Sequence, residues 1–158
     1  PAIGISFMYP PDTDIIIENL PAKSYFDFLA YIYKTKDSKR FLSIKTKKTT
    51  EDPQKLFIQS LCGECDPEMV LEANYEQPIS KYINGKKVFQ YLYRKEVKSP
   101  LKIYDYYTSE YDHRDALETY PTQFLVTKHN NQVIIMGVII TEQDKWPDKV
   151  ISTLKFTD

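Results

Sequence analysis

The sequence predicts a single α+β domain over residues 1–158, in which two or three helices pack on a largely antiparallel β-sheet. Thirteen Tyr and eight Phe stand against four Gly, and aromatic residues favour the pleated, half-buried surface of a sheet. Several extended apolar segments are joined by short turns, as antiparallel strands are. Segments with helical entry signals interrupt these strands, which is the element order of an α+β fold.

The N-terminal part contains three predicted strands and one short apolar extended run. The strands are expected at Ile3–Tyr9, Tyr25–Lys34 and Arg40–Lys47, and the extended run at Asp14–Glu18. Pro10-Pro11 ends the first strand, because proline cannot donate to a ladder. Within Tyr25–Lys34, the period of two is expected to place four apolar residues on one face: Phe26, Phe28, Ala30 and Ile32.

Seven basic residues lie on or near the hairpin formed by the second and third predicted strands: Lys34, Lys36, Lys39, Arg40, Lys45, Lys47 and Lys48. Such a cluster is also found on nucleic-acid-binding and anionic-membrane-binding surfaces. Acidic residues at Asp37, Glu51 and Asp52 dilute it, however. Because lysines protect exposed sheet edges from aggregation, we interpret this cluster as edge protection.

The middle of the chain is expected to contain two helices and a tight hairpin. A helix is predicted to begin near Glu51-Asp52-Pro53, since acidic residues and proline favour a first helical turn. A second helical turn or two is expected over Pro67–Glu72, with Met69 and Val70 apolar. Asn84-Gly85 separates Ile79–Ile83 from Lys86–Arg94 and predicts a two-residue type I′ turn. A further strand at Leu101–Thr108 and a polar loop at Ser109–Pro121 are expected to follow.

The last third predicts a hairpin, a helix and a final strand. The hairpin arms are Thr122–His129 and Gln132–Thr141, around Asn130-Asn131, a pair that tolerates left-handed backbone. The second arm is apolar on both faces, so a central, covered position is expected. A helix at Asp144–Thr153 and an extended piece at Leu154–Phe156 close the chain.

The charge balance and the lengths of the apolar runs exclude two classes of partner. With 21 basic and 22 acidic residues, the net charge is −1, whereas a nucleic-acid binder usually has a basic excess. No apolar run reaches the ~18 residues that a membrane span needs. We therefore predict neither a nucleic-acid partner nor a membrane span.

The N-terminus bears on location. The sequence begins Pro1-Ala2-Ile3-Gly4, without Met. Small residues there are compatible with cleavage of a signal peptide just upstream. We expect a periplasmic or secreted protein, with a cytoplasmic location as the alternative.

One cysteine pair carries recognisable chemistry: Cys62-Gly63-Glu64-Cys65. At this spacing two thiols form a redox disulfide, half a zinc site or a structural staple. Glu64, Asp66 and Glu68 disfavour a thiolate, and the two histidines lie 16 positions apart, not at zinc-finger spacing. We interpret Cys62 and Cys65 as a structural disulfide or two inert thiols, the disulfide being favoured if the protein is exported.

A tyrosine-rich segment is the candidate contact with a partner. Tyrosine offers a large amphipathic surface and is enriched where proteins contact partners. The residues concerned are Tyr104, Tyr106, Tyr107, Tyr111 and His113. Asp112, His113 and Asp115 would alternatively form a metal or acid–base site, and a solvated loop whose tyrosines pack on the sheet would explain the same pattern.

The central and final segments resemble the Mog1/PsbP-like superfamily. The resemblance lies in Asn84-Gly85-Lys86-Lys87 running into Val88–Tyr93, in the hairpin Phe124–Val126 with Val133–Ile139, and in the ending Lys149–Phe156. It implies a binding or accessory module, because members of that superfamily are mostly non-catalytic adaptors, and many bacterial ones are exported.

Three functions are therefore considered. The favoured one is a non-catalytic module, without catalytic, cofactor or metal residues, that contacts a protein through a tyrosine-rich loop or a sheet edge. The second is a carrier of a small ligand or lipid, with a cavity lined by the aromatic faces of Tyr25–Lys34 and Lys86–Arg94. The third is an enzyme with a site near residues 112–115. No Gly-rich phosphate loop and no known nucleophile motif is present in the sequence.

Overall fold

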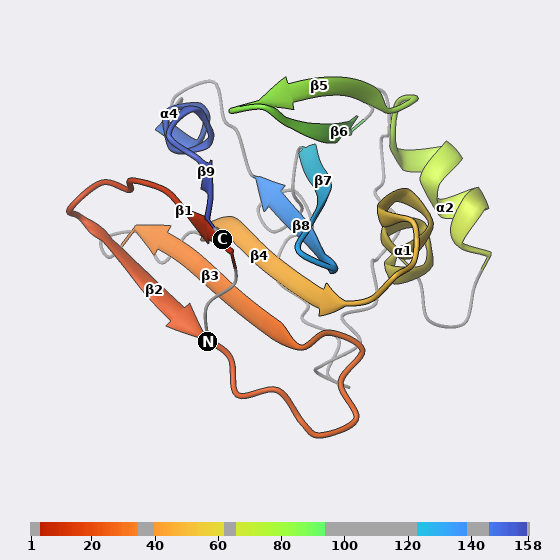
Figure 1. Cartoon of the computed structure of the whole chain (residues 1–158), viewed down its shortest axis with the longest axis horizontal. Coiled ribbons are helices and arrows are strands. Elements are labelled where there is room, and N and C mark those ends of the chain that lie inside the picture. The colour runs from red at the N-terminus through yellow and green to blue at the C-terminus, as the bar shows by residue number, and fades with distance from the viewer. Residues whose placement is uncertain (1–3, 35–39, 62–65, 94–122, 139–145, 158) are drawn as a thin grey trace.

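A computed structural model describes residues 4–34, 40–61, 66–93, 123–138 and 146–157 of the chain (Figure 1). Seven antiparallel strands form one sheet in the order β2-β3-β4-β8-β7-β6-β5, and β1 and β9 form a separate antiparallel pair. The α+β class and the largely antiparallel sheet are thus confirmed. The strands are β1 (Ile5–Ser6), β2 (Thr13–Ile17), β3 (Phe28–Lys34), β4 (Arg40–Lys48), β5 (Ile79–Ile83), β6 (Lys86–Leu92), β7 (Gln123–His129), β8 (Gln132–Val138) and β9 (Lys155–Phe156). The helices are α1 (Pro53–Ser60), α2 (Pro67–Asn74) and α4 (Trp146–Ser152).

The entry signals of the first helix act as predicted, and the second helix begins in the same way. The carboxylate of Asp52 accepts hydrogen bonds from the backbone N–H groups of Gln54 and Lys55, at 2.9 and 3.1 Å. Asp66 accepts one from Glu68 N–H at 3.0 Å. In both helices, proline takes the first position, where its missing N–H would have no partner within the helix.

The two short hairpins depend on residues that tolerate positive φ. Asn84 and Gly85 have φ values of 47° and 78°, and Asn130 and Asn131 have φ values of 46° and 56°. These are the backbone conformations of type I′ turns, whose twist matches that of the strands they join. Both hairpins predicted from the sequence, β5–β6 and β7–β8, are therefore confirmed.

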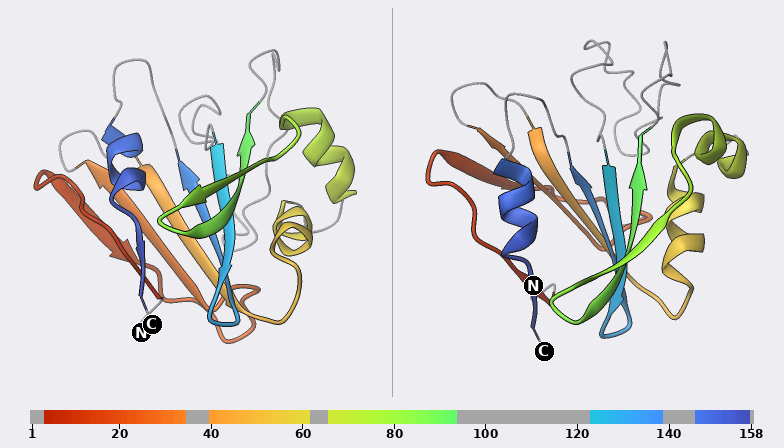
Figure 2. Two further views of the ribbon diagram at one scale, coloured as in Figure 1. Left: turned by 45° about the horizontal axis from the view of Figure 1, so that its top comes forward. Right: turned by 90° about the horizontal axis from the view of Figure 1, so that it is seen from above.

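The β7–β8 hairpin forms the centre of the sheet. Strand β8 lies between β4 and β7, and every residue from Val133 to Val138 is buried. Figure 2 shows α4 on one side of the sheet and α1 and α2 on the other. The expectation of a central strand covered on both faces is correct.

The sheet separates two apolar cores. The α4-side core lies beneath α4 and the β1–β9 pair, and its buried members are Ile32, Leu42, Ile44, Val88, Leu125, Ile134, Met136, Val138, Val150 and Leu154. The α1-side core lies beneath α1 and α2, and its buried members are Phe26, Leu56, Phe57, Leu61, Val70, Tyr75, Tyr91, Phe124, Val126, Val133 and Ile135. Successive side chains along β8 point alternately into one core and then into the other.

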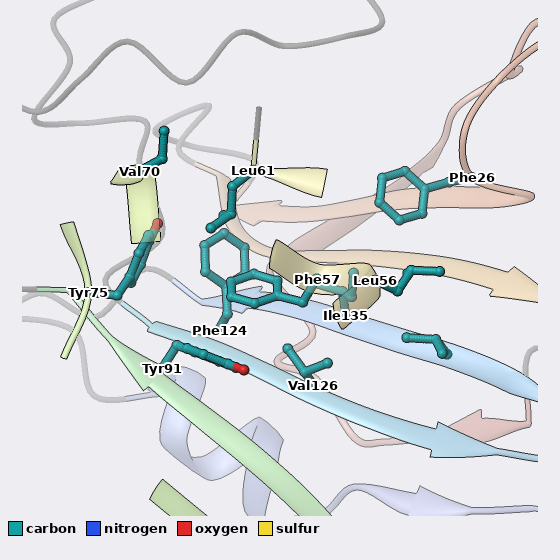
Figure 3. Packing of buried hydrophobic residues seen from close by; sticks show 11 residues of the cluster. Phe26, Leu56, Phe57, Leu61, Val70, Tyr75, Tyr91, Phe124, Val126 and Ile135 are labelled. Atoms are coloured by element: carbon teal, nitrogen blue, oxygen red, sulfur yellow. The ribbon is translucent and has the colours of Figure 1, made fainter. Parts of the chain in front are cut away.

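The α1-side core is centred on aromatic rings. Figure 3 shows Phe57 of α1 between the rings of Tyr91 and Phe124. The ring centroid of Phe57 lies 4.4 Å from that of Tyr91, 5.0 Å from that of Phe124 and 6.3 Å from that of Tyr75. Such tilted and edge contacts add about 0.5–1.5 kcal/mol per pair to the burial term. They hold α1 against β6 and β7.

Two expectations about the N-terminal strands are wrong. Strands β3 and β4 both lie inside the sheet, so the basic residues of the cluster on these two strands do not protect a sheet edge. Lys36 and Lys39 lie outside the described residues. Instead, the ammonium of Lys47 lies 3.6 Å from the ring centroid of Tyr25, and that of Lys45 lies 5.5 Å from the ring centroid of Phe26. These are cation–π contacts.

Phe26 and Phe28 also do not share a face. Phe26 belongs to the α1-side core, while Phe28 packs against the α4-side core. The chain bends at residues 25–27, and β3 begins only at Phe28. Asp27 fixes the bend, because its N–H donates to Thr46 O at 2.9 Å and its carboxylate accepts from Lys48 N–H at 2.6 Å. The period of two therefore does not continue through residue 27.

The β1–β9 pair joins segments from opposite ends of the chain. Ile5 pairs with Phe156, and Thr157 N–H donates to Gly4 O at 3.0 Å. His129 Nε2 bonds Thr157 O at 2.9 Å, and Met8 N–H donates to the hydroxyl of Thr153 at 2.9 Å. The predicted extended piece at Leu154–Phe156 is thus a strand that pairs with the first strand and not with the main sheet.

Candidate functional site

The site residues predicted from the sequence lie outside the described residues. These are the partner-contact candidates Tyr104, Tyr106, Tyr107, Tyr111 and His113, the acidic residues Asp112 and Asp115, and the cysteine pair Cys62 and Cys65. They remain predictions. The predicted strand Leu101–Thr108 and loop Ser109–Pro121 also fall there.

The described part of the chain contains no group of three or more His, Cys, Asp or Glu side chains that could hold a metal ion. No helix in that part is long and apolar enough to cross a membrane.

Most of the exposed large apolar side chains lie on the two edge strands of the sheet or just before β2. Eight large hydrophobic residues are exposed among the described residues, and five of them lie in the short stretch around β2: Met8, Tyr9, Ile15, Ile16 and Ile17. The exposed fractions of Ile15, Ile16 and Ile17 are 42%, 44% and 61%. The other three, Met69, Ile79 and Tyr82, lie on α2 and β5. Scattered single residues would need no explanation, but a clustered set of exposed apolar residues marks a contact surface.

Strand β2 lies at one edge of the sheet (Figure 1). Glu18 N–H donates to Leu29 O at 2.9 Å, and alternate residues of an antiparallel strand bond to the same neighbour. The N–H and C=O groups of Ile15 and Ile17 therefore point outward. Thr13 follows the same pattern, since its N–H turns to Pro10 O at 3.3 Å.

The three isoleucines of β2 are distributed over both faces of the sheet. Ile15 and Ile17 lie opposite Ile32 and Ala30 of β3, on the α4 side, and Ile16 lies opposite Tyr31, on the other side. Asp12, Asp14 and Glu18 flank them, and all three side chains are exposed. We call residues 12–18 the β2 edge. It is an apolar strand with an acidic boundary at each end.

The opposite edge of the sheet, β5, differs in charge. Because Ile83 pairs with Lys86 across a two-residue turn, alternate residues from Ile83 bond inward, and Ser80 and Tyr82 present their backbone groups outward. Lys81 lies at the centre of β5, with Lys86 and Lys87 on the neighbouring strand. A lysine at the middle of an edge strand is a common protection against pairing. The β2 edge has no lysine within residues 12–18.

One titratable group in the core has a perturbed pKa. Burial raises the pKa of the Tyr91 phenol above its ordinary value of 10.0, the hydrogen bond from Gln54 lowers it, and the charge of Asp52 raises it. Tyr91 is 0% exposed and its ring lies against Phe57. This arrangement keeps the phenol neutral and packed, which is a structural role.

The aromatic segments proposed to line a ligand cavity do not lie side by side in the sheet. Strands β3 and β6 are separated by β4, β8 and β7. The rings that both segments contribute to the α1 side, such as Phe26 and Tyr91, are buried members of the α1-side core (Figure 3).

Comparison with known proteins gives a likeness of fold. No protein family model matches the chain, and no curated protein matches it. The solution structure of cyanobacterial PsbP (CyanoP) from Synechocystis sp. PCC 6803 superposes with a TM-score of 0.57 and 12% sequence identity, over 97% of this chain and 86% of that one. The PsbP-like fold expected from the sequence resemblance is therefore confirmed. At this identity the likeness concerns the fold alone.

Proposed function

We propose that this chain is a non-catalytic binding or accessory module that contacts a partner protein through the β2 edge. The observation that carries the proposal is the outward-pointing backbone of Ile15 and Ile17, combined with exposed isoleucines on both faces of that strand. A partner strand that pairs there gains main-chain hydrogen bonds and buries apolar side chains at the same time. The resemblance to a superfamily of adaptors and accessory proteins supports this class of function.

The size of the β2 edge indicates that it does not act alone. Full burial of one isoleucine contributes about 1.5–3 kcal/mol, and Ile15, Ile16 and Ile17 are already partly buried. Their remaining contribution is about 3 kcal/mol in total on this scale, whereas micromolar affinity needs about 8 kcal/mol. Main-chain hydrogen bonds and a second contact must supply the difference. We assign the second contact to the tyrosine-rich segment, Tyr104–Tyr111.

We place this module outside the cytoplasm, in the periplasm or as a secreted protein. The resemblance to a superfamily with many exported bacterial members supports this location. A fusion to alkaline phosphatase, which is active only after export, tests it. A phosphatase fusion that is made in full length but stays inactive would contradict it.

Recovery of a partner with matched edge variants tests the binding function. Ile15→Pro removes one outward N–H and leaves the pairing with β3 intact, because proline is tolerated where the N–H faces solvent. Tyr82→Pro makes the same change at β5 and serves as the control. We expect the wild-type chain and Tyr82→Pro to recover the same partner from an extract of the native cell, and Ile15→Pro to recover at least tenfold less.

A third variant tests the second contact. Tyr106→Ser combined with Tyr107→Ser is expected to weaken recovery while leaving the circular dichroism spectrum and the melting temperature unchanged. Recovery that is equal for the wild type and Ile15→Pro would remove the β2 edge from the proposal. Equal recovery with the double tyrosine variant would remove the tyrosine-rich segment.

A further inference from the structure

We infer that the β2 edge takes an extended segment whose apolar centre is bounded on both sides by basic residues. This inference rests on the proposed function and identifies the chemistry of the partner. The physical basis is the order of side chains along the edge, in which acidic residues enclose three isoleucines.

The backbone of the edge defines how the partner lies. Ile15 and Ile17 each present one N–H and one C=O outward, two residues apart, which is the repeat of an antiparallel or parallel strand. A helix or a globular side-chain surface cannot match these groups. The partner segment is therefore extended over at least the residues opposite Ile15–Ile17.

The side chains of the edge define the centre of the partner. Ile15 and Ile17 project on the α4 side of the sheet and Ile16 on the opposite side. A strand paired with them places consecutive side chains alternately on the same two faces. The partner thus needs three consecutive apolar residues, and not the apolar–polar alternation of a strand with one solvated face.

The charges define the flanks. Asp14 and Glu18 stand directly before and after the isoleucines, four residues apart, which is about 13 Å along a strand. A paired strand lies about 4.8 Å away, well within the ~8 Å Debye length at physiological ionic strength. Basic residues at the matching positions are attracted and acidic ones repelled, and opposite charges across a strand pair stabilise it.

The same charges disfavour a second copy of this chain in the two registers centred on Ile16 and Ile15. A twofold antiparallel pair centred on Ile16 places Asp14 opposite Glu18 of the other copy, and one centred on Ile15 places Asp12 opposite Glu18. Like charges directly opposite destabilise a strand pair. Strand β5 of a second copy fits poorly as well, because Lys81 lies at its centre, where apolar residues are needed.

Three labelled peptides with one apolar centre test the inference by fluorescence anisotropy. Their sequences are TKVIVKT, TTVIVTT and TEVIVET, each acetylated and amidated. In the antiparallel register, the two flanking residues of each peptide meet Asp14 and Glu18. We expect TKVIVKT to bind at least tenfold more tightly than TEVIVET, with TTVIVTT between them. Raising NaCl from about 0.05 M to about 0.5 M is expected to remove most of this difference by screening.

A charge-reversed variant makes the test reciprocal. Asp14→Lys combined with Glu18→Lys is expected to prefer TEVIVET over TKVIVKT by a similar factor. Both side chains are exposed, and the Glu18 N–H that bonds Leu29 O is retained, so the fold is expected to persist. Ile15→Pro is expected to abolish binding of all three peptides, while Tyr82→Pro retains it.

The outcomes separate the inference from the proposed function. Equal affinity for the three peptides would overturn the inference that the partner carries basic flanks. The β2 edge would remain a binding site. No binding of any peptide, even at millimolar concentration, would overturn the inference, while recovery of a partner by the wild type and not by Ile15→Pro would still support the proposed function. Concentration-dependent dimerisation in analytical ultracentrifugation, abolished by Ile15→Pro, would overturn the inference in favour of a second copy of this chain.

Discussion

The side-chain amide of Gln54 on α1 donates a hydrogen bond of 3.1 Å to the phenol oxygen of Tyr91 on β6. This bond satisfies a polar atom inside the α1-side core, where Tyr91 is 0% exposed. An unsatisfied phenol there would cost about 1–3 kcal/mol. The contact therefore ties the position of α1 to the sheet through both packing and hydrogen bonding.

The raised pKa of Tyr91 predicts a specific alkaline sensitivity. At pH 8 the phenol is protonated in the folded and unfolded chains, so its titration does not affect stability there. Above the unfolded pKa of about 10, the unfolded chain releases a proton that the folded chain retains, and the free energy of unfolding falls by up to about 1.4 kcal/mol per pH unit.

Tyr91→Phe removes this term. Urea unfolding at pH 8, 10 and 11 measures how the free energy of unfolding changes with pH. The variant is expected to lose less of this free energy between pH 10 and 11 than the wild type. At pH 8 the variant is expected to be less stable by about 1 kcal/mol, the usual contribution of one hydrogen bond. Parallel slopes for the two proteins would show that Tyr91 does not set the alkaline limit.

Removal of the Phe57 ring is expected to be strongly destabilising. Phe57 is 1% exposed and contacts the rings of Tyr91 and Phe124. Phe57→Ala combines lost burial with a cavity and is expected to cost about 3–5 kcal/mol. Tyr82→Ala, at a side chain that is 73% exposed, is the control and is expected to cost less than about 0.5 kcal/mol. Similar losses of unfolding free energy in the two variants would show that neighbouring side chains move to fill the space left by the Phe57 ring.

Two glycines with positive φ are expected to respond differently to alanine. Gly4 and Gly85 have φ values of 68° and 78°, so either change strains the backbone by about 1–2 kcal/mol. A Cβ at Gly4 would also lie 2.9 Å from Cδ2 of His129, whereas a Cβ at Gly85 meets nothing within 4 Å. We expect Gly4→Ala to lower the melting temperature clearly more than Gly85→Ala. Equal shifts of the melting temperature in the two variants would mean that the His129 ring moves aside to accommodate the new Cβ.

The cysteine pair is expected to be oxidised in the exported protein. Cys62 and Cys65 should then resist alkylation by iodoacetamide until a reductant is added. Because the closed loop is very short, loss of the disulfide in Cys62→Ser with Cys65→Ser is expected to cost no more than about 2 kcal/mol. Immediate alkylation of both thiols in protein purified from an oxidising compartment would contradict the disulfide.

Local chemistry explains which elements were predictable from the sequence. The turns at Asn84-Gly85 and Asn130-Asn131 need positive φ, and asparagine and glycine supply it wherever the hairpins lie. The helix starts at Asp52-Pro53 and Asp66-Pro67 depend on backbone groups within one turn. These signals act over a few residues and do not depend on the rest of the fold.

Long-range pairing explains what was missed. The local pattern of β4 does not show that Ile44 pairs with Met136, the pairing that makes β4 an inner strand. The lysine cluster by itself therefore predicts an edge. The exposure of Ile15–Ile17 is likewise decided by strand order, because an apolar run of this length normally indicates a buried strand. The bend at Asp27 depends on bonds to β4, and it ended the alternation expected for Phe26 and Phe28.

The β1–β9 pair sets the order in which the chain can complete its fold during synthesis. Every strand of the seven-stranded sheet has been synthesised once Val138 leaves the ribosome. Ile5, however, cannot form its strand pairing until Phe156 has been synthesised. Until then Ile5 and Phe7, which pack against the α4-side core, lack the strand and helix that hold them there. A chain truncated before α4 would thus display part of its apolar interior, which chaperones and quality-control proteases recognise.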